Sequence, residues 1–448
     1  MTPGLPLRAA VPSTTTVRLE SVGDRDAIVA SVEMERRRGA LTPADGDKLT
    51  TAARQAREAR LPFVIYIASS GADVAEGLPA LDGWGRAARE FTRTSGVVPI
   101  IAAVTGPAVS GSALLVGLAD HVVMTEDAYA FVSGPVPVRL MTGVNVGIGD
   151  LGGSATHQRA TGVASMVVED RQQAVHAVTD ILAYLPDHAD ALPPRVDTTD
   201  PSDRPTPEAA DLLPITSTGS YDVRDIAAVL VDDGILLEVR GGWAPNIVTA
   251  FATFGGRPVG IVANQPRAIA GTLDIPASQK AARFVSFCDA FNLPIVTLVD
   301  TPGFYPGKDL EWRGMIRHGA QLAFAYARAT VPRVAVVLRK SYGGAYIVMD
   351  STTMGNDVYL AWPTAELAVM GAEQAAEVLY RRASPHQRSE LVAEYEDRHL
   401  NPYVAAERGY VDAVVEPAET RRVLVDSIDL LMTKRERLVD RRHDNMPL

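Results

Sequence analysis

The chain has 448 residues, enough for two or three domains, and its 47% hydrophobic and 22% charged residues are typical of a well-cored globular protein. A formal net charge of −11, without any block of Lys or Arg, excludes a general nucleic-acid binder. The single cysteine, Cys288, excludes an intrachain disulfide and a multi-cysteine zinc site. We therefore expect a cytoplasmic protein that holds no metal of its own.

An uncharged stretch, residues 94–119, is long enough to suggest a membrane span. Pro99, Gly106, Pro107 and Gly111 interrupt it. Because such residues break a spanning helix, a buried strand, a glycine turn and a buried helix explain the stretch better. We expect no contact with a membrane.

In chain order, apolar runs of strand length alternate with amphipathic runs of helix length. Residues 1–20 are rich in Pro and Thr and predict a loose lead-in. The predicted strands are Ala27–Glu33, Phe63–Ile67, Val97–Val104, Val259–Ala263, Ile295–Val299 and Val334–Leu338. The predicted helices are Asp45–Ala59, Leu78–Ser95, Gly314–Ala329 and Arg421–Arg437. Strand and helix in this alternation indicate a layered α/β fold.

The composition changes after Leu185. Residues 186–214 are rich in proline and acidic residues and have little periodicity, which is typical of a linker. We expect an N-terminal domain at residues 1–185 and a C-terminal domain at residues 215–448.

One stretch in the C-terminal domain carries a chemical signal. The strand Val334–Leu338 leads into Gly343, Gly344 and Ala345, where a helix is expected to begin. The first backbone N–H groups of a helix have no intrahelical partner, and the helix dipole favours a negative charge there. The turn is therefore predicted to be an oxyanion hole.

The two halves of the chain form an internal repeat. Four intervals between marker residues correspond in order. Three have identical lengths: Pro62–Gly71 with Pro294–Gly303, Pro99–Gly111 with Pro332–Gly344, and Asp120–Gly134 with Asp357–Gly371; Pro62–Pro99 and Pro294–Pro332 differ by one residue. The repeat places Ser110 and Gly111 at the position of the glycine turn. Two oxyanion holes in one chain predict a reaction with two enolate-like partners.

Residues 60–448 resemble the β-subunit type of biotin-dependent carboxyltransferases, found in propionyl-CoA and acetyl-CoA carboxylases. The resemblance rests on the following motifs: Gly260–Pro266, Ala281–Val285, Phe287–Asn292, Asp300–Phe304, Ile316–Ala320, Arg339–Tyr346, Ala361–Glu366 and Asn445–Leu448. It implies two tandem domains of the crotonase fold (ClpP/crotonase superfamily). It also implies partner chains, since the sequence contains neither a biotin-attachment motif nor an ATP-binding loop.

The resemblance assigns roles to both turns. The C-terminal domain would handle carboxybiotin delivered by a carrier protein, with the N–H groups of Gly344 and Ala345 on the biotin oxygen. The N-terminal domain would hold an acyl-CoA or another acyl thioester, with its enolate oxygen at Ser110 and Gly111. The other expected binding residues are Ser70, Gly71, Ala72, Gly343, Tyr346 and Ile347. The family's chains meet in dimers, usually within hexamers, and work with a biotin carboxylase subunit; a hetero-oligomer with a related β-subunit is also open.

The N-terminal domain departs from the family pattern. Ser110-Gly111 replaces a glycine pair, and Asp73 replaces a cation after Gly71-Ala72. The glycine-rich turn expected near residues 36–42 is reduced to Gly39, next to a basic cluster. An apolar Ile347 favours an acetyl-like or nonstandard acyl group. The acceptor site is thus expected to be remodelled, with Asp73 disfavouring the phosphates of CoA; drift at surface positions explains these changes as well.

Three other functions remain open. Ser110 could be a hydrolytic nucleophile, although its nearest downstream histidine, His121, is predicted at a strand start. The two holes could instead serve a decarboxylase of a malonyl-type thioester that needs no biotin. The chain could also be a non-catalytic paralogue that assembles with an active β-subunit.

Overall fold

The structure is a computed structural model that describes residues 5–6, 13–216, 218–381, 384–434 and 436–447. Its described residues form two compact units. The first unit comprises the described parts of residues 1–194 together with residues 240–243 and 290–292. The second unit comprises the described parts of residues 195–239, 244–289 and 293–448. The domain limits at residues 185 and 215 remain a prediction, because this division rests on contacts and not on independent folding.

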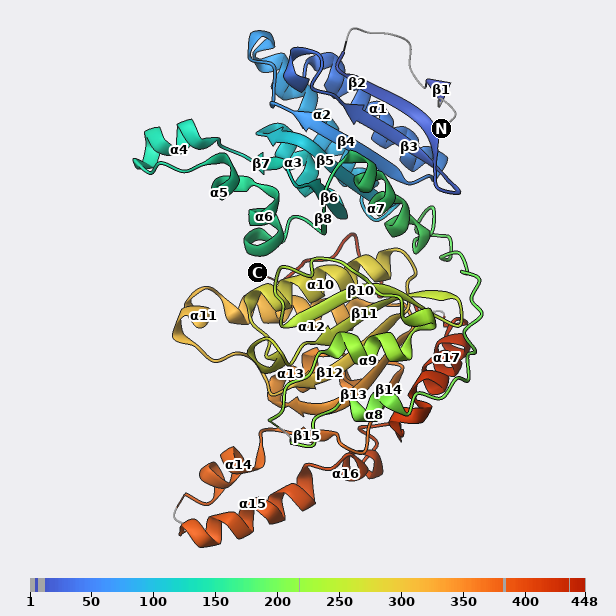
Figure 1. Ribbon diagram of the computed structural model, residues 1–448, viewed down its shortest axis with the longest axis vertical. Coiled ribbons are helices and arrows are strands. Elements are labelled where there is room, and N and C mark those ends of the chain that lie inside the picture. Colours follow the sequence, from blue (N-terminus) through green and yellow to red (C-terminus); the bar gives the residue numbers. More distant parts are fainter. Residues whose placement is uncertain (1–4, 7–12, 217, 382–383, 435, 448) are drawn as a thin grey trace. The chain divides into compact units, whose positions relative to one another are not determined.

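The first unit is built on an eight-stranded sheet (Figure 1). The strand order is β1-β2-β3-β4-β5-β6-β8, with β7 paired to β5. These strands are β1 (Leu5–Pro6), β2 (Thr15–Val22), β3 (Arg25–Val32), β4 (Phe63–Ser69), β5 (Ile100–Val109), β6 (His121–Thr125), β7 (Tyr129–Phe131) and β8 (Met166–Val168). Its α-helices are α1 (Pro43–Ala59), α2 (Leu78–Thr94), α3 (Gly111–Gly117), α4 (Pro135–Thr142), α5 (Ile148–Gly152), α6 (Ser154–Thr156) and α7 (Arg171–Ala183).

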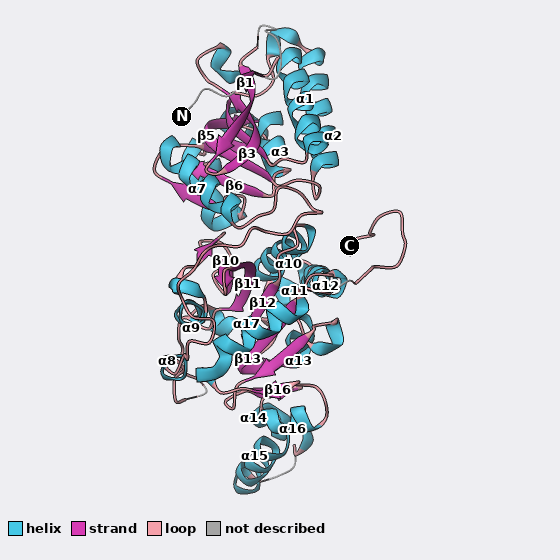
Figure 2. Cartoon of the chain, turned by 90° about the vertical axis from the view of Figure 1, so that its right-hand side faces the viewer, coloured by secondary structure: helices cyan, strands magenta, loops and turns pink. Residues whose placement is uncertain are grey.

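The second unit has the same plan (Figure 2). Its strand order is β16-β14-β13-β12-β11-β10-β9, with β15 paired to β13. The strands are β9 (Leu237–Glu238), β10 (Ile247–Phe254), β11 (Arg257–Asn264), β12 (Ile295–Thr301), β13 (Arg333–Tyr342), β14 (Val358–Ala361), β15 (Glu366–Ala368) and β16 (Ala413–Val414). The α-helices are α8 (Glu208–Asp211), α9 (Val223–Leu230), α10 (Ile275–Ala290), α11 (Lys308–Trp312), α12 (Met315–Arg328), α13 (Gly343–Val348), α14 (Ala372–Leu379), α15 (Pro385–His399), α16 (Pro402–Glu407) and α17 (Thr420–Leu431).

The predicted internal repeat is confirmed by the pairing of the strands. In each unit an antiparallel hairpin, β2–β3 or β10–β11, precedes strands that pair only in parallel. The register of β4 and β5 shifts between Ile67 and Ser69, and that of β12 and β13 shifts between Val299 and Thr301. Each unit thus has the same β-bulge shortly before the glycine turn.

The predicted strands and helices agree with the structure except at particular ends. Residues 15–20, predicted as part of a loose lead-in, belong to β2, which pairs with β3 along its whole length; most of the remaining lead-in lies outside the described residues. Strands β5 and β13 run five and four residues beyond their predicted ends at Val104 and Leu338, because each acquires a second partner, β7 or β15. Helix α17 ends at Leu431 and not at Arg437.

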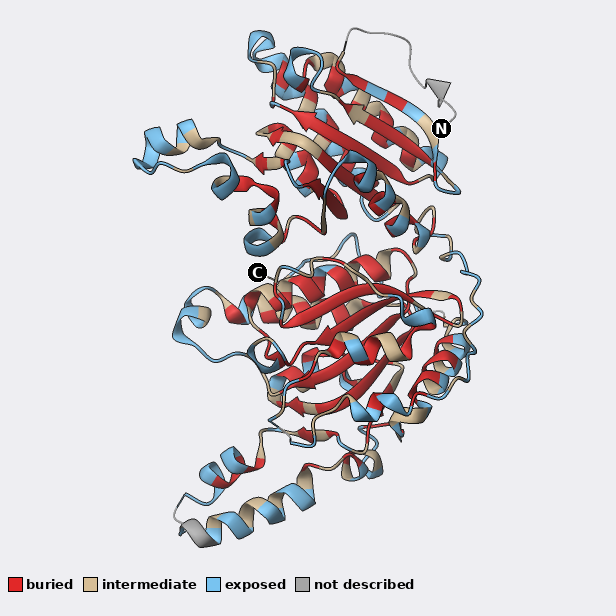
Figure 3. Cartoon of the chain, viewed as in Figure 1, coloured by how far each residue is buried: buried red, intermediate tan, exposed pale blue. Residues whose placement is uncertain are grey.

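Each unit has its own hydrophobic core against its sheet, and the buried residues follow the strands (Figure 3). The central strands β4 and β12 are buried along their full length, which explains their continuous apolar runs. Residues 94–119 form the end of α2, then β5 and α3, as the sequence predicted. Among the described residues, the helices are all too short or too polar to cross a membrane.

Candidate functional site

The second-unit turn, Tyr342–Ala345, joins β13 to α13. Gly343 has φ +58°, a conformation that favours glycine, and no side chain caps the start of α13. Helices such as α1, α7 and α9 begin with a side chain that accepts a backbone N–H, whereas α13, like α2, α4 and α12, does not. The first-turn N–H groups at Gly344 and Ala345 therefore have neither an intrahelical partner nor a capping side chain.

Gly344 is packed closely on one side. A Cβ atom at this position would lie 3.4 Å from the ring of Phe304, which follows β12. The same ring lies 3.2 Å from the corresponding position on Gly319 in α12. Gly344 itself remains exposed. The turn is thus held between two elements while its glycine is open to a ligand.

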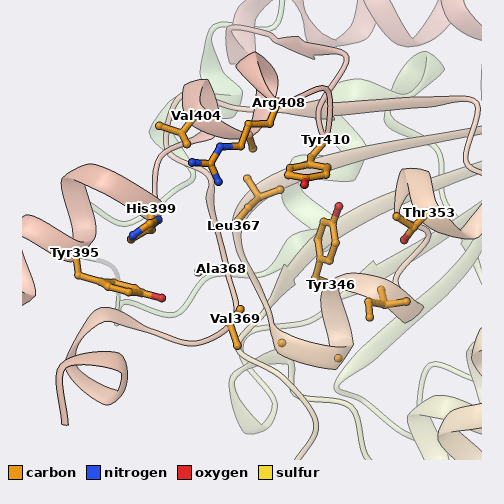
Figure 4. A pocket seen from close by; sticks show the side chains of 14 residues that line it. Tyr346, Thr353, Leu367, Ala368, Val369, Tyr395, His399, Val404, Arg408 and Tyr410 are labelled. Carbon is orange, nitrogen blue, oxygen red and sulfur yellow. The ribbon is translucent and has the colours of Figure 1, made fainter. Parts of the chain in front are cut away.

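The second-unit turn borders a pocket of about 600 Å³ (Figure 4). Its lining combines the turn and α13 with β15 and the helices α15 and α16, as follows: Gly343, Gly344, Tyr346, Ile347, Thr353, Leu367, Ala368, Val369, Tyr395, His399, Val404, Ala405, Arg408 and Tyr410. The lining is mainly apolar, with three tyrosines and one arginine. Desolvation and then the neighbouring Tyr410 raise the pKa of Tyr346 above its ordinary value of 10.0.

The sequence had pointed to Gly343, Gly344, Tyr346 and Ile347 of this pocket and missed its other wall. That wall comes from α15 and α16, some 50 to 65 residues farther along the chain. Nothing in the local pattern of Tyr395 or Arg408 differs from an ordinary charged helix. Only the tertiary fold brings them to the glycine turn.

The first-unit turn, Val109–Ser112, joins β5 to α3 in the same way. Ser110 has φ +59° and ψ −120°, and α3 has no capping side chain. The N–H of Ser110 donates to Phe131 O at 2.9 Å, so this group is already used within the sheet. The donors left without an intrahelical partner are Gly111 and Ser112, one position later than the sequence suggested.

Gly111 lies beneath an aromatic ring. A Cβ atom on Gly111 would lie 2.8 Å from the indole of Trp84 in α2. Gly111 is buried, whereas Gly344 is exposed. The first-unit turn is therefore narrower than the second-unit turn, as the departures in its sequence suggested.

The loop Ser70–Ala72 lies against the first-unit turn. A Cβ atom on Gly71 would lie 2.9 Å from Val109 O and 3.5 Å from Ser110 Cβ. The loop is fastened to the residues that follow β3: Ser70 N–H donates to Arg38 O at 3.1 Å, and Leu41 N–H donates to Gly71 O at 2.8 Å. The fold thus brings together the two stretches that sequence analysis had grouped.

Asp73, the anion that follows this loop, has a cationic partner. Its carboxylate lies 3.0 Å from Arg37 Nη1, and Arg37 also lies 3.6 Å from Glu76. Arg37 comes from the turn that the sequence singled out for its missing glycines. The charge of Asp73 is therefore compensated locally, which weakens the expectation that it repels phosphates.

The histidines of the first unit bond elsewhere. His121 Nδ1 lies 3.3 Å from Ser165 Oγ, and His157 bonds to Ala130 O and Thr161 Oγ1. No hydrogen bond between a histidine and Ser110 is found among the described residues, so Ser110 has no histidine that could activate it as a nucleophile. Within the same residues, no group of His, Cys, Asp and Glu could hold a metal ion.

Two α/β units related by a repeat, each with an uncapped glycine turn after a bulged strand, define a tandem crotonase-like enzyme. Residues 21–446 match the family model of the carboxyl transferase domain, and the chain belongs to this family. It is a carboxyltransferase, and the family resemblance predicted from the sequence motifs is confirmed.

The most similar curated proteins include carboxyltransferase subunits. The propionyl-CoA carboxylase carboxyltransferase subunit of Haloferax mediterranei is 42% identical over 417 residues, 92% of this chain and 81% of that protein. The methylmalonyl-CoA carboxyltransferase 12S subunit of Propionibacterium freudenreichii subsp. shermanii is 43% identical over 410 residues, 89% and 77% of the two chains. A solved structure of the transcarboxylase 12S hexamer matches with a TM-score of 0.95 at 40% identity, covering 97% of this chain and 85% of that one.

Proposed function

We propose that this carboxyltransferase moves CO2 from carboxybiotin, carried by a partner protein, to the α-carbon of an acyl thioester. The observation that carries the proposal is the pair of uncapped turns at equivalent positions of two repeated units, one of them open to a 600 Å³ pocket. Two preorganised sets of N–H donors suit a reaction in which negative charge develops on two oxygens.

The second-unit turn fits the carrier's group. Carboxybiotin, when bound, supplies the CO2 and afterwards a basic nitrogen. The N–H groups of Gly344 and Ala345 would hold its ureido oxygen, and Tyr346 and Ile347 would pack against its rings. The mainly apolar lining and the absence of a capping side chain at α13 support this assignment. No side chain of the turn has to move a proton.

The first-unit turn fits the acceptor. Gly111, with Ser112, would hold the oxygen of the thioester as it gains charge, and the loop Ser70–Ala72 would lie along the acyl chain. The N–H of Ser110 is not a free donor, because it bonds to Phe131 O. Ser110 contributes instead its positive φ, which orients the start of α3. Because Trp84 covers Gly111, the space at the acyl group is limited.

The acceptor is proposed to be a small acyl-CoA. Relatives are named for propionyl-CoA and methylmalonyl-CoA, and the cover of Gly111 by Trp84 favours a short acyl group. The neutralised Asp73 removes one argument against the phosphates of CoA. A thioester on a carrier protein is the alternative that substrate assays must exclude.

The partners follow from the same reading. We infer a biotin carboxyl carrier and a biotin carboxylase subunit, and an assembly like the hexamer of the 12S relative. Other relatives are named as biotin-dependent carboxylase β subunits. The free, buried Cys288 is in keeping with action in the cytoplasm.

The test is carboxyl exchange with defined small molecules. The purified protein is mixed with free biotin and either methylmalonyl-CoA or malonyl-CoA. The products measured are carboxybiotin and the decarboxylated thioester, propionyl-CoA or acetyl-CoA. Biotin-dependent exchange supports the proposal. Release of CO2 without biotin would instead identify a biotin-independent decarboxylase. Inactivity alone, with activity regained on adding a related β-subunit, would identify a non-catalytic paralogue.

A further inference from the structure

Two charged side chains lie buried near the end of the strands that carry the second-unit turn. Asp300 on β12 is 1% exposed and Arg339 on β13 is 7% exposed. Asp300 Oδ2 lies 3.0 Å from Arg339 Nε. Taking two charges out of water is costly unless well-placed partners compensate. Such a pair, five residues before Gly344, therefore needs an explanation.

The carboxylate of Asp300 occupies the bulge between β12 and β13. The parallel ladder is interrupted between Val299 and Thr301, where backbone groups lose their regular partners. Here the N–H of Lys340 donates to Asp300 Oδ1 at 3.1 Å, and the hydroxyl of Tyr221 donates to Oδ2 at 2.8 Å. Asp300 thus holds the backbone of Lys340 and the side chain of Arg339, two residues that lead into the turn.

Arg339 also hydrogen-bonds a third segment of the second unit, which contains Thr216 and Gly219. Its Nη1 donates to Gly219 O at 2.8 Å and to Thr216 O at 3.4 Å. Its guanidinium also lies 5.2 Å from the centre of the Tyr221 ring, a cation–π contact. The planar fork of an arginine can make these contacts at once, which a lysine ammonium cannot.

The first unit has the same bulge without the charges. The repeat places Ala68 at the position of Asp300 and Gly106 at that of Arg339. These residues are in contact, since a Cβ atom on Gly106 would lie 3.1 Å from Ala68 Cβ. The register shift between β4 and β5 nevertheless forms. The fold therefore does not require a charged pair here, and the pair is particular to the second-unit turn.

We propose that Asp300 and Arg339 are positioning residues for the second-unit turn: they fix the path of β13 after the bulge and so the direction of the N–H groups of Gly344 and Ala345. The proposal rests on the proposed function of that turn. Oxyanion donors act only when they are held close to their productive geometry before the charge develops. Neither side chain touches the substrate.

The test replaces both charges with neutral amides, Asp300→Asn, which keeps the shape, with the shorter Arg339→Gln. In exchange between free biotin and methylmalonyl-CoA, we expect kcat to fall roughly tenfold or more, below the ~100-fold cost of losing an oxyanion donor outright. The KM for methylmalonyl-CoA should remain unchanged, because the thioester is assigned to the first-unit turn. The single variant Arg339→Lys keeps the charge without the fork and should recover only part of kcat.

A matched control uses another buried ion pair of the second unit, Asp232 and Arg421, whose Oδ1 and Nη2 lie 2.7 Å apart. The variant Asp232→Asn with Arg421→Gln removes a similar pair between residues 232–234 and α17, and it should lower the melting temperature while kcat stays near the wild-type value. Equal kcat losses in both double variants would overturn the proposal, because the loss would then reflect general destabilisation. A wild-type kcat in the Asp300–Arg339 variant would overturn it as well.

Amide hydrogen exchange provides a readout that needs no substrate. Peptides covering residues 340–348 should exchange faster in the Asp300–Arg339 variant, whereas peptides covering residues 106–115 should not change. Unchanged exchange at residues 340–348 would contradict the inference. If the wild-type protein showed no biotin-dependent exchange, the proposed function would fail, and the hydrogen-exchange result would still decide whether the pair orders the turn.

Discussion

Arg37 and Asp73 form an ion pair between two stretches that both depart from the family pattern, with Nη1 and Oδ2 3.0 Å apart. Arg37 belongs to the turn after β3, and Asp73 follows the loop Ser70–Ala72. The guanidinium is half exposed, whereas the carboxylate is largely covered. A cation therefore remains at the edge of the first unit, contributed by a different residue.

The first prediction follows from this pair. The variant Arg37→Ala leaves Asp73 uncompensated beside the loop Ser70–Ala72, so we expect the KM for an acyl-CoA to rise several-fold and the increase to shrink at high salt. Stability should change by less than about 1 kcal/mol, because exposed ion pairs contribute little. Steady-state kinetics at two ionic strengths and a melting curve test both statements.

Arg86→Ala is the matched control for Arg37→Ala. Arg86 pairs with Asp47 and Asp82 on the exposed sides of α1 and α2. The variant Arg86→Ala loses a similar surface ion pair but leaves no uncompensated carboxylate beside the loop Ser70–Ala72. An equal rise in KM for both variants would show that overall charge, and not the local pair, controls binding.

The sequence predicted the α/β class, the repeat and the position of both turns, because these depend on local patterns and spacing. The apolar runs at Phe63–Ile67 and Ile295–Val299 predicted central strands, and glycine after such a strand predicted a turn. The ends of β5 and β13 were missed because their last residues pair with β7 and β15, which no local pattern announces.

The parts of the candidate site that the sequence did not predict are tertiary contacts. Trp84 above Gly111, Arg408 in the pocket, and the pairing of Arg37 with Asp73 each join residues far apart in the chain. The use of the Ser110 N–H by Phe131 depended on the same unpredicted pairing of β5 with β7. The local pattern of the sequence therefore indicated the two turns but not the distant residues that pack against them.

The second prediction contrasts the two glycines. The variant Gly111→Ala should destabilise the protein by about 1–3 kcal/mol, because its Cβ would meet the Trp84 ring at 2.8 Å. The variant Gly344→Ala meets Phe304 at an ordinary contact distance of 3.4 Å, so its stability should stay within about 0.5 kcal/mol of the wild type. Urea unfolding measures both changes.

The same two variants separate stability from activity. Gly344→Ala should retain the fold, so a fall in biotin exchange in this variant would reflect a change at the proposed site and not a loss of stability. Adding Trp84→Leu to Gly111→Ala should restore part of the lost stability, since the two positions are in contact. Strictly additive effects of the two substitutions would contradict the packing of Trp84 on Gly111.

The third prediction concerns Ser110. Its φ of +59° with ψ of −120° is a conformation that glycine adopts freely and serine does not. The variant Ser110→Gly should therefore raise stability by about 1 kcal/mol and retain carboxyl exchange. Ser112→Gly is the opposite control: Ser112 lies inside α3, so glycine should destabilise there by about 1 kcal/mol. Loss of all turnover in Ser110→Gly would instead support the hypothesis that Ser110 is a catalytic nucleophile.

The fourth prediction concerns the buried Asp45, which lies in the first turn of α1. Its carboxylate accepts hydrogen bonds from the hydroxyls of Ser13, Thr14 and Thr42 and from the N–H groups of Thr15 and Thr42. Burial alone would raise its pKa, but the hydrogen bonds from Ser13, Thr42 and Thr15 hold the pKa below the ordinary value of 3.8. The ionised form is thus favoured in the folded state.

The sign of the pH effect follows from that shift. A carboxyl group whose pKa is lower in the folded than in the unfolded protein stabilises fully above the unfolded value, and this contribution disappears as the pH falls through the folded value. Asp45→Asn should therefore cost about 2–3 kcal/mol at pH 7, and the difference from the wild type should narrow below pH ~4. Asp47→Asn, on the exposed side of the same helix, should cost less than about 1 kcal/mol. Urea unfolding of the three proteins across this pH range decides the matter: a cost for Asp45→Asn that stays constant into acid would show that its hydrogen bonds do not depend on the charge.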